Sequence, residues 1–87
     1  MKLNSKRNIT IFCMIYTIYI HLMNEGIDVL RPAQGEHMGG MVYRILPNQK
    51  YDQEDEQWQF SPGTLVHCIY KFDNGNRIIV ANREVDK

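Results

Sequence analysis

The sequence has few cysteines, prolines and glycines, and it carries no excess of charge of either sign. Its 87 residues include two cysteines, three prolines and six glycines. Two cysteines outside any CxxC motif do not make a disulfide framework, so they indicate a reducing compartment or use as small apolar side chains. A chain of this length, without a visible linker or repeat, predicts a single domain over residues 1–87.

The balance of charge limits the classes of partner. Lys and Arg total 10, and Asp and Glu total 10, so the formal net charge is zero. Proteins dedicated to nucleic acids usually bind the phosphates through a basic surface. The sequence therefore predicts no nucleic-acid partner. A net charge near zero also favours self-association.

A hydrophobic run long enough to span a membrane is also missing. The uncharged run over residues 8–23 follows basic residues, as in a secretory signal, but it is only 16 residues long. It contains Tyr, Thr and His and lacks a small-residue cleavage site. Because Ile, Tyr and Thr favour strands, we predict a first strand over residues 9–23, with residues 1–15 as an N-terminal extension that continues it. Without a signal or a membrane span, we also predict a cytoplasmic location and no membrane partner.

This first strand has two different parts. Ile18, Ile20 and Leu22 alternate with more polar residues, as expected of a strand with one buried face. Before them, apolar residues fall on both faces, so both faces need cover, which a second copy can supply. The sequence thus predicts a homodimer, with candidate self-association residues Ile9, Ile11, Phe12, Met14, Ile15 and Tyr16.

Four further strands are predicted over residues 29–34, 41–46, 64–72 and 77–82. Pro32 cannot donate a hydrogen bond within a sheet, so the second strand is expected at an edge or bent. The glycines of residues 35–40 predict a turn, and Asn74-Gly75 predicts a hairpin. Five strands without a capped 3.6-residue period predict an all-β fold: a small antiparallel barrel or β-roll, SH3-like or OB-like.

The clearest local motif is the acidic and aromatic loop YDQEDEQWQFSPG over residues 51–63. A calcium loop of the EF-hand type fails, because Gln57 and Gly63 stand where Gly and Glu are required. A looser divalent-cation site stays an alternative. We expect at most one helical turn, carboxylates facing water, and Trp58 and Phe60 filling the mouth of the barrel. Arg31 and Arg44 are expected to pair with these carboxylates. The candidate partner-binding residues are Asp52, Glu54, Asp55, Glu56, Arg31 and Arg44.

Other chemistry finds little support in the spacing of reactive residues. His21, His37 and His67 offer zinc ligands together with Cys13 or Cys68, but neighbours such as His67 and Cys68 point to opposite faces of a strand. Cys68 is more readily a small buried apolar residue than a nucleophile. Phosphate-binding glycine motifs are missing. The sequence predicts no metal, no cofactor and no enzymatic activity.

A longer pattern runs through most of the chain from Tyr19 onward. It consists of Glu25 and Gly26; Val29, Leu30, Arg31 and Pro32; Tyr43, Arg44, Ile45 and Leu46; Tyr51, Asp52, Glu54, Asp55 and Glu56; Trp58 and Phe60; Pro62, Gly63, Val66 and Cys68. This pattern resembles a group of small bacterial proteins with no assigned activity. The chain departs from the group at Leu30, where the group has Trp, and at Gln53, where it has Pro. The resemblance implies a small bacterial cytoplasmic domain and transfers no function.

The charge pattern of the loop predicts the kind of partner. An acidic surface that bears aromatic residues fits a protein with a basic surface, because complementary potentials steer association. We therefore predict a non-enzymatic domain that self-associates and binds a protein through this loop. Two alternatives stay open: an antitoxin-like or immunity-like inhibitor of a basic protein, and a small-ligand or enzyme site lined by Tyr43, Trp58 and His67.

Overall fold

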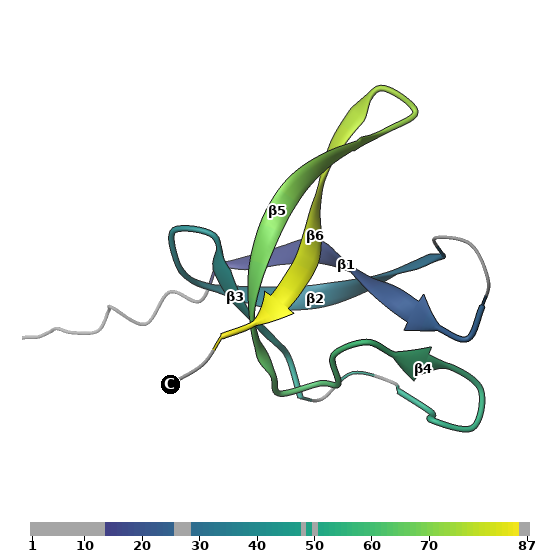
Figure 1. Ribbon diagram of the computed structural model, residues 1–87. Helices are drawn as coiled ribbons and strands as arrows, with labels where there is room; N and C mark the ends of the chain where they lie inside the picture. Colours follow the sequence, from purple (N-terminus) through teal and green to yellow (C-terminus); the bar gives the residue numbers. More distant parts are fainter. Residues whose placement is uncertain (1–13, 26–28, 48, 50, 86–87) are drawn as a thin grey trace, which may run out of the picture.

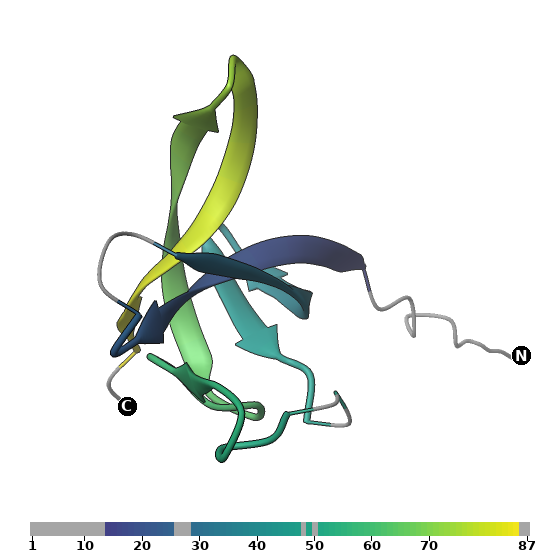
Figure 2. The same ribbon diagram turned by 90° about the vertical axis from the view of Figure 1, so that its right-hand side faces the viewer.

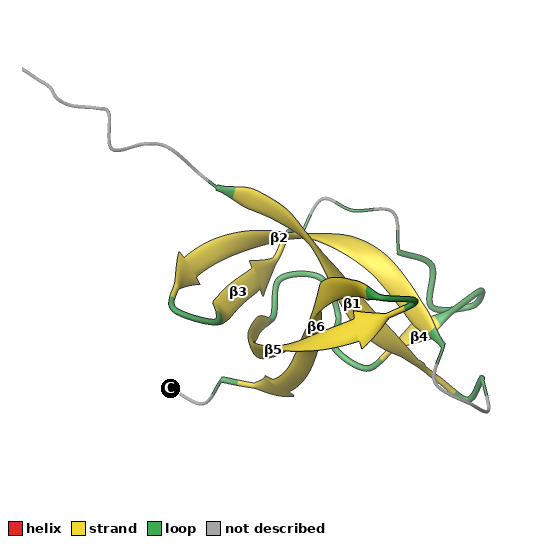
Figure 3. Ribbon diagram, turned by 90° about the horizontal axis from the view of Figure 1, so that it is seen from above, coloured by secondary structure: helices red, strands yellow, loops and turns green. Residues whose placement is uncertain are grey.

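The computed structural model describes residues 14–25, 29–47, 49 and 51–85, and in these residues the chain is all-β (Figures 1 and 3). Six strands are present, and no helix in the described residues is able to cross a membrane. Residues 9–13 of the predicted first strand lie outside the described residues. The strands are β1 (Ile15–Met23), β2 (Leu30–Gly39), β3 (Val42–Ile45), β4 (Gln57–Trp58), β5 (Leu65–Asp73) and β6 (Asn76–Glu84).

Five of the strands close into a ring, in the order β1, β2, β3, β5, β6 and back to β1. Neighbours in the ring follow one another along the chain and are antiparallel, apart from the closing pair. Because the number of strands is odd, an up-and-down ring has to close with one parallel pair, and Tyr19 of β1 indeed pairs in parallel with Val80 of β6. The predicted small five-stranded barrel is confirmed. The two-residue strand β4, attached to the end of β1, was not predicted.

The core lies inside this ring and follows the alternation of the strands. Ile18 and Ile20 of β1 are fully buried, as the sequence pattern predicted. Trp58 is also buried and Phe60 packs against the core from the loop, so these two aromatics close the barrel as expected. The remaining buried hydrophobic residues are Ala33, Tyr43, Ile45, Val66, Cys68, Val80 and Ala81.

The predicted edge strand around Pro32 is confirmed: β2 as a whole pairs with both β1 and β3, but around Pro32 its only strand neighbour among the described residues is β1. The physical reason is local. β3 reaches β2 only over residues 35–39, and the backbone N–H and C=O of Gln34 already turn away from β1, toward Gln49 and Leu46. Pro32, two residues earlier, directs its nitrogen to that same flank, so its missing donor leaves the pairing with β1 intact.

The turn predicted over residues 35–40 is shorter than expected. Gly35 lies within β2, and the chain reverses only at Gly39 and Gly40, whose φ values are 126° and 54°. Gly35 is instead a point of close approach inside the barrel: a Cβ atom placed there would lie 2.8 Å from Ile18 Cδ1. This position therefore keeps β2 close to the core face of β1.

We predict that Gly35→Ala lowers the free energy of unfolding by about 1–3 kcal/mol, because the added methyl group overpacks a filled core. Ile18→Val removes the Cδ1 atom that the new methyl would meet. The double variant Gly35→Ala/Ile18→Val should therefore lose less stability than the sum of the two single variants, measured by urea denaturation. Strictly additive losses would show that the contact between these residues does not determine the effect.

Candidate functional site

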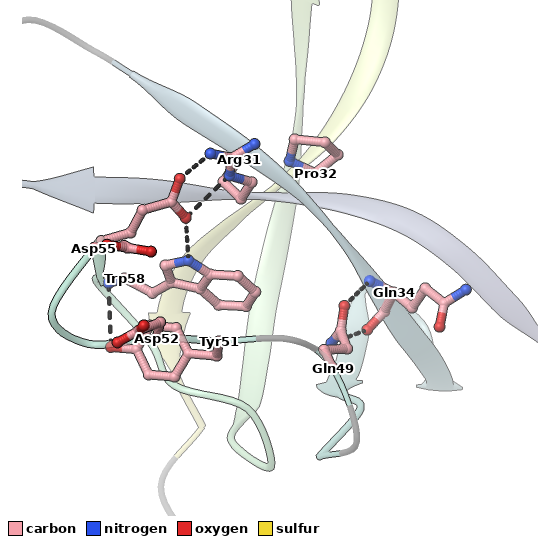
Figure 4. Close-up of a pocket in the computed structure, with 9 residues that line it drawn as sticks. Arg31, Pro32, Gln34, Gln49, Tyr51, Asp52, Asp55 and Trp58 are labelled. Carbon is pink, nitrogen blue, oxygen red and sulfur yellow. Dashed lines mark hydrogen bonds and ion pairs between the residues drawn. The ribbon is translucent and has the colours of Figure 1, made fainter.

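An open groove of about 720 Å³ lies between β2 and the acidic loop (Figure 4). One wall is β2, and the other is formed by residue 49, the acidic loop from Tyr51 onward, and Trp58 of β4, so residues far apart in the sequence face each other across the groove. The lining residues are Arg31, Pro32, Gln34, Gln49, Tyr51, Asp52, Asp55, Glu56 and Trp58.

Two aromatic rings form the floor of the groove. The ring centroids of Tyr51 and Trp58 are 4.8 Å apart, with the ring planes tilted by 48°. Trp58 is held by β4, which pairs it with Leu22 at the end of β1, and its backbone N–H donates to the Tyr51 hydroxyl over 3.4 Å. The floor is thus anchored to the closing strand of the barrel.

Glu56 connects the loop to β2. Its carboxylate accepts hydrogen bonds from Arg31 Nε at 3.0 Å and from the indole Nε1 of Trp58 at 3.1 Å, and it forms an ion pair with Arg31 Nη2. The Glu56 side chain is only 23% exposed. Of the four loop carboxylates, this one departs from the expectation that all face water, because it holds the arginine and the indole in place.

Asp52 organises the loop itself. Its backbone C=O accepts from the N–H groups of Asp55 at 3.0 Å and Glu56 at 2.9 Å, while its Oδ1 accepts from the N–H of Glu54 at 2.9 Å. This is the single helical turn that the sequence predicted, with Asp52 as its N-terminal cap. The turn directs Asp52 and Asp55 to the groove, whereas Glu54 lies outside it.

Gln49 closes the other end of the groove. Its side-chain amide accepts from the backbone N–H of Gln34 at 2.6 Å and donates to the C=O of the same residue at 3.0 Å. The amide therefore takes the place of a neighbouring strand along the part of β2 that β3 does not reach. A third bond, to the C=O of Leu46, fixes the amide in this position.

The groove is acidic. Three carboxylates and one guanidinium line it, and Glu56 already neutralises Arg31. Asp52 and Asp55 have no cationic partner among the described residues and remain exposed. Carboxylates beside the faces of a tryptophan and a tyrosine suit a cationic ligand, since both attract positive charge. What the arrangement supports chemically is binding.

The structure brings together only part of the predicted partner-binding set. Arg31, Asp52, Asp55 and Glu56 line the groove, and Glu54 lies on the outer side of the loop. Arg44 pairs with Glu36 of β2 at 3.1 Å, so the pairing expected between Arg44 and the loop is not found. Of the predicted self-association set, Met14, Ile15 and Tyr16 are exposed, and Ile9, Ile11 and Phe12 lie outside the described residues.

The histidines and Cys68 are dispersed. Among the described residues, no three His, Cys, Asp or Glu side chains lie close enough to hold a metal ion. The alternative ligand site is not assembled either: Tyr43 pairs with Val66 and points into the barrel, whereas His67 points to the opposite face. His37 Nε2 instead lies 2.8 Å from the C=O of Gly40.

Sequence reasoning missed Pro32, Gln34, Gln49 and Tyr51 as groove residues. Two of them, Pro32 and Tyr51, belong to the pattern that resembles the small bacterial proteins, and this pattern was the available signal. The glutamines gave none, because an amide that completes a sheet edge is not distinguishable in the sequence from any polar loop residue.

The chain matches no family model, no curated protein and no solved structure. The resemblance to the small bacterial proteins therefore stays a prediction.

Cys68 is a free, buried thiol. Burial raises the pKa of Cys68 from its ordinary value of 9.0 to about 11, so the thiol is protonated and unreactive at neutral pH. Burial, and then the nearby phenol of Tyr70, also raises the pKa of Tyr43. Both groups belong to the packing of the core.

These pKa values predict a loss of stability at alkaline pH. A raised folded-state pKa stabilises the fold fully below the unfolded pKa, and the contribution is lost as pH rises through the folded value. For Cys68 the free energy of unfolding should fall between pH 9 and about pH 11, by up to about 3 kcal/mol. Cys68→Ala should be less stable at neutral pH but show a shallower alkaline decline in denaturation experiments. An identical decline in both proteins would contradict this assignment.

Proposed function

We propose that this protein is a non-enzymatic binding module whose groove receives a basic segment of a partner protein. The observation that carries the proposal is the acidic groove with an aromatic floor, in a chain whose formal net charge is zero. Asp52 and Asp55 supply the attraction for a cation. Tyr51 supplies the main surface against which an arginine or lysine side chain packs, and the buried ring of Trp58 holds Tyr51 in place. The proposal includes a reducing, cytoplasmic compartment, which suits the free thiol of Cys68.

The contacts inside the groove suggest how binding energy is distributed. Exposed ion pairs contribute only about 0–1 kcal/mol each, so the two aspartates mainly steer and orient the partner. The aromatic floor supplies apolar contact at little entropic cost, because Glu56 already fixes the indole. An antitoxin-like or immunity-like role is one form of this proposal, in which the basic segment belongs to the protein that is inhibited.

The test uses a fluorescein-labelled synthetic peptide of alternating Arg and Tyr residues. We expect saturable binding by fluorescence anisotropy that weakens as salt is added, since the attraction is screened. The variant Asp52→Asn/Asp55→Lys should weaken binding by about tenfold or more. Asparagine at position 52 preserves the oxygen that caps the loop, so this variant should fold normally.

Two controls separate the groove from general charge. The variant Glu25→Gln/Glu84→Lys changes the net charge by the same amount at exposed positions outside the groove, and it should bind the peptide as the unaltered protein does. A peptide with Glu in place of Arg should not bind. Equal weakening by both variants, or binding of the acidic peptide, would reject the groove as the binding site.

Self-association is a second candidate, which the start of β1 favours. Met14 is 53% exposed and Ile15 is 43% exposed, although both are large apolar side chains. Exposed apolar residues at the start of a strand favour pairing with the sheet of another chain. We propose that this end of β1 pairs with a second copy.

The variant Met14→Lys/Ile15→Lys should shift the sedimentation coefficient toward that of a monomer at micromolar concentrations, because charged side chains oppose edge pairing. Val29→Lys, another exposed apolar position on the surface, should leave sedimentation unchanged. A protein that already sediments as a monomer over this range would remove the proposal.

A further inference from the structure

The hairpin of β5 and β6 extends well beyond the barrel (Figure 1). β3 pairs with β5 only over residues 65–67, and β1 reaches β6 only at Val80. Beyond these points the two strands pair only with each other, up to Asp73 and Asn76. The turn between them, Asn74-Gly75, has φ values of 51° and 82°, as the predicted Asn-Gly hairpin requires.

One face of this hairpin continues the core into solvent. It starts at the buried pair Cys68 and Ala81 and passes through the cross-strand pair Tyr70 and Ile79. Tyr70 is half exposed, and Phe72, the next residue on the same face, is 77% exposed. So large an exposed aromatic contributes little to the stability of its own barrel, and such side chains mark interaction surfaces.

The same face also carries a cation. Arg77 is the cross-strand partner of Phe72, and its guanidinium carbon lies 4.2 Å from the centroid of the Tyr70 ring. Lys71 lies on the opposite face and adds a second positive charge, against the single carboxylate of Asp73. The hairpin therefore combines exposed aromatic rings with an excess of positive charge.

This chemistry complements that of the groove. The groove joins the aromatic floor of Tyr51 and Trp58 to the carboxylates of Asp52 and Asp55. The hairpin and the acidic loop lie at opposite ends of the molecule in both Figure 1 and Figure 2, so a hairpin does not reach the groove of its own chain. A second copy of the chain offers a hairpin to this groove and a groove to this hairpin. Because the formal net charge is zero, two copies do not repel each other.

We propose that the β5–β6 hairpin of one copy docks into the groove of a second copy, with Arg77 beside Asp52 and Asp55 and with Phe72 against Tyr51, the floor ring that is not buried. The proposal rests on the proposed function, because it names a second copy of this chain as the source of the basic segment. The hairpin is already formed up to its turn, so docking orders little new backbone. Since each copy offers both a hairpin and a groove, the contact is heterologous and extends into a ring or a chain of copies.

The test uses two variants that each remove one half of the contact. The groove variant is Asp52→Asn/Asp55→Lys, and the hairpin variant is Phe72→Ser/Arg77→Glu. All four side chains are exposed, so both proteins should fold, the hairpin variant with only a small loss of thermal stability from the missing contact between Arg77 and Tyr70. Each variant is immobilised in turn, and capture of each variant from solution is measured by biolayer interferometry.

The expected pattern is that of a hairpin-in-groove contact, and the control variant Glu25→Gln/Glu84→Lys separates it from net charge. Two copies of this control carry the same added positive charge as two groove variants, but their hairpins and grooves are intact, so they should capture each other. The immobilised groove variant should capture the hairpin variant, and the reverse, because each mixed pair retains one intact hairpin and one intact groove. Capture within either like pair should be weaker by about tenfold or more. Capture between two groove variants equal to that of the mixed pair would indicate contact between hairpins and overturn the proposal. Capture that is equal in all four pairings, or missing from the mixed pairs, would also overturn it.

The peptide experiment separates this inference from the proposed function. If the Arg-Tyr peptide binds the groove in a manner that depends on Asp52 and Asp55 while the mixed pairs fail to capture each other, the binding function stands and the second copy is not the partner. If neither the peptide nor the mixed pair binds, both proposals fail. The control variant Glu25→Gln/Glu84→Lys should capture the unaltered protein normally.

Discussion

The whole structure depends on how β1 closes the barrel. An up-and-down ring of five strands cannot close with antiparallel pairs alone, and here the parallel contact between β1 and β6 is confined to Tyr19 and Val80. β1 also pairs with β2 along most of its length and holds β4 at its end. The strand that supplies Ile18 and Ile20 to the core is thus the one on which closure, the floor of the groove and the loop position all depend.

So short a closing contact leaves other parts of the chain without neighbours. From Val80 toward their turn, β5 and β6 pair only with each other and continue as a hairpin. The residues of β2 that precede Gly35 do not pair with β3. The first gap leaves the aromatic face of the hairpin uncovered, and the second is filled by the amide of Gln49 and the acidic loop. Both surfaces proposed to bind, the hairpin and the groove, therefore arise because β2, β5 and β6 are longer than the segments over which the ring pairs them.

Local sequence signals predicted much of this fold. The alternation of apolar and polar residues predicted the buried face of β1, and Asn74-Gly75 predicted the hairpin turn. The spacing of Trp58 and Phe60 predicted that the aromatic residues of the loop pack against the core. The wrong predictions concern positions whose structure is determined by contacts between residues far apart in the sequence. Gly35, predicted to lie in a turn, lies within β2 because it packs against the side chain of Ile18, which no residue near it in the sequence reveals. In the same way, Arg31 pairs with Glu56 and Arg44 with Glu36, a choice set by register.

Residue-resolved amide hydrogen exchange of the variant Ile18→Ala tests closure by β1 most directly. The backbone amides of Leu22, Ile45 and Cys68 lie in β1, β3 and β5. Each donates to a backbone carbonyl next to the end of another strand. If β1 closes a single cooperative ring, the substitution should speed exchange at all three by the same factor, since all open through global unfolding. Amides of the projecting hairpin, which open locally, should keep their rates. Faster exchange restricted to β1 and its immediate partners would contradict the account.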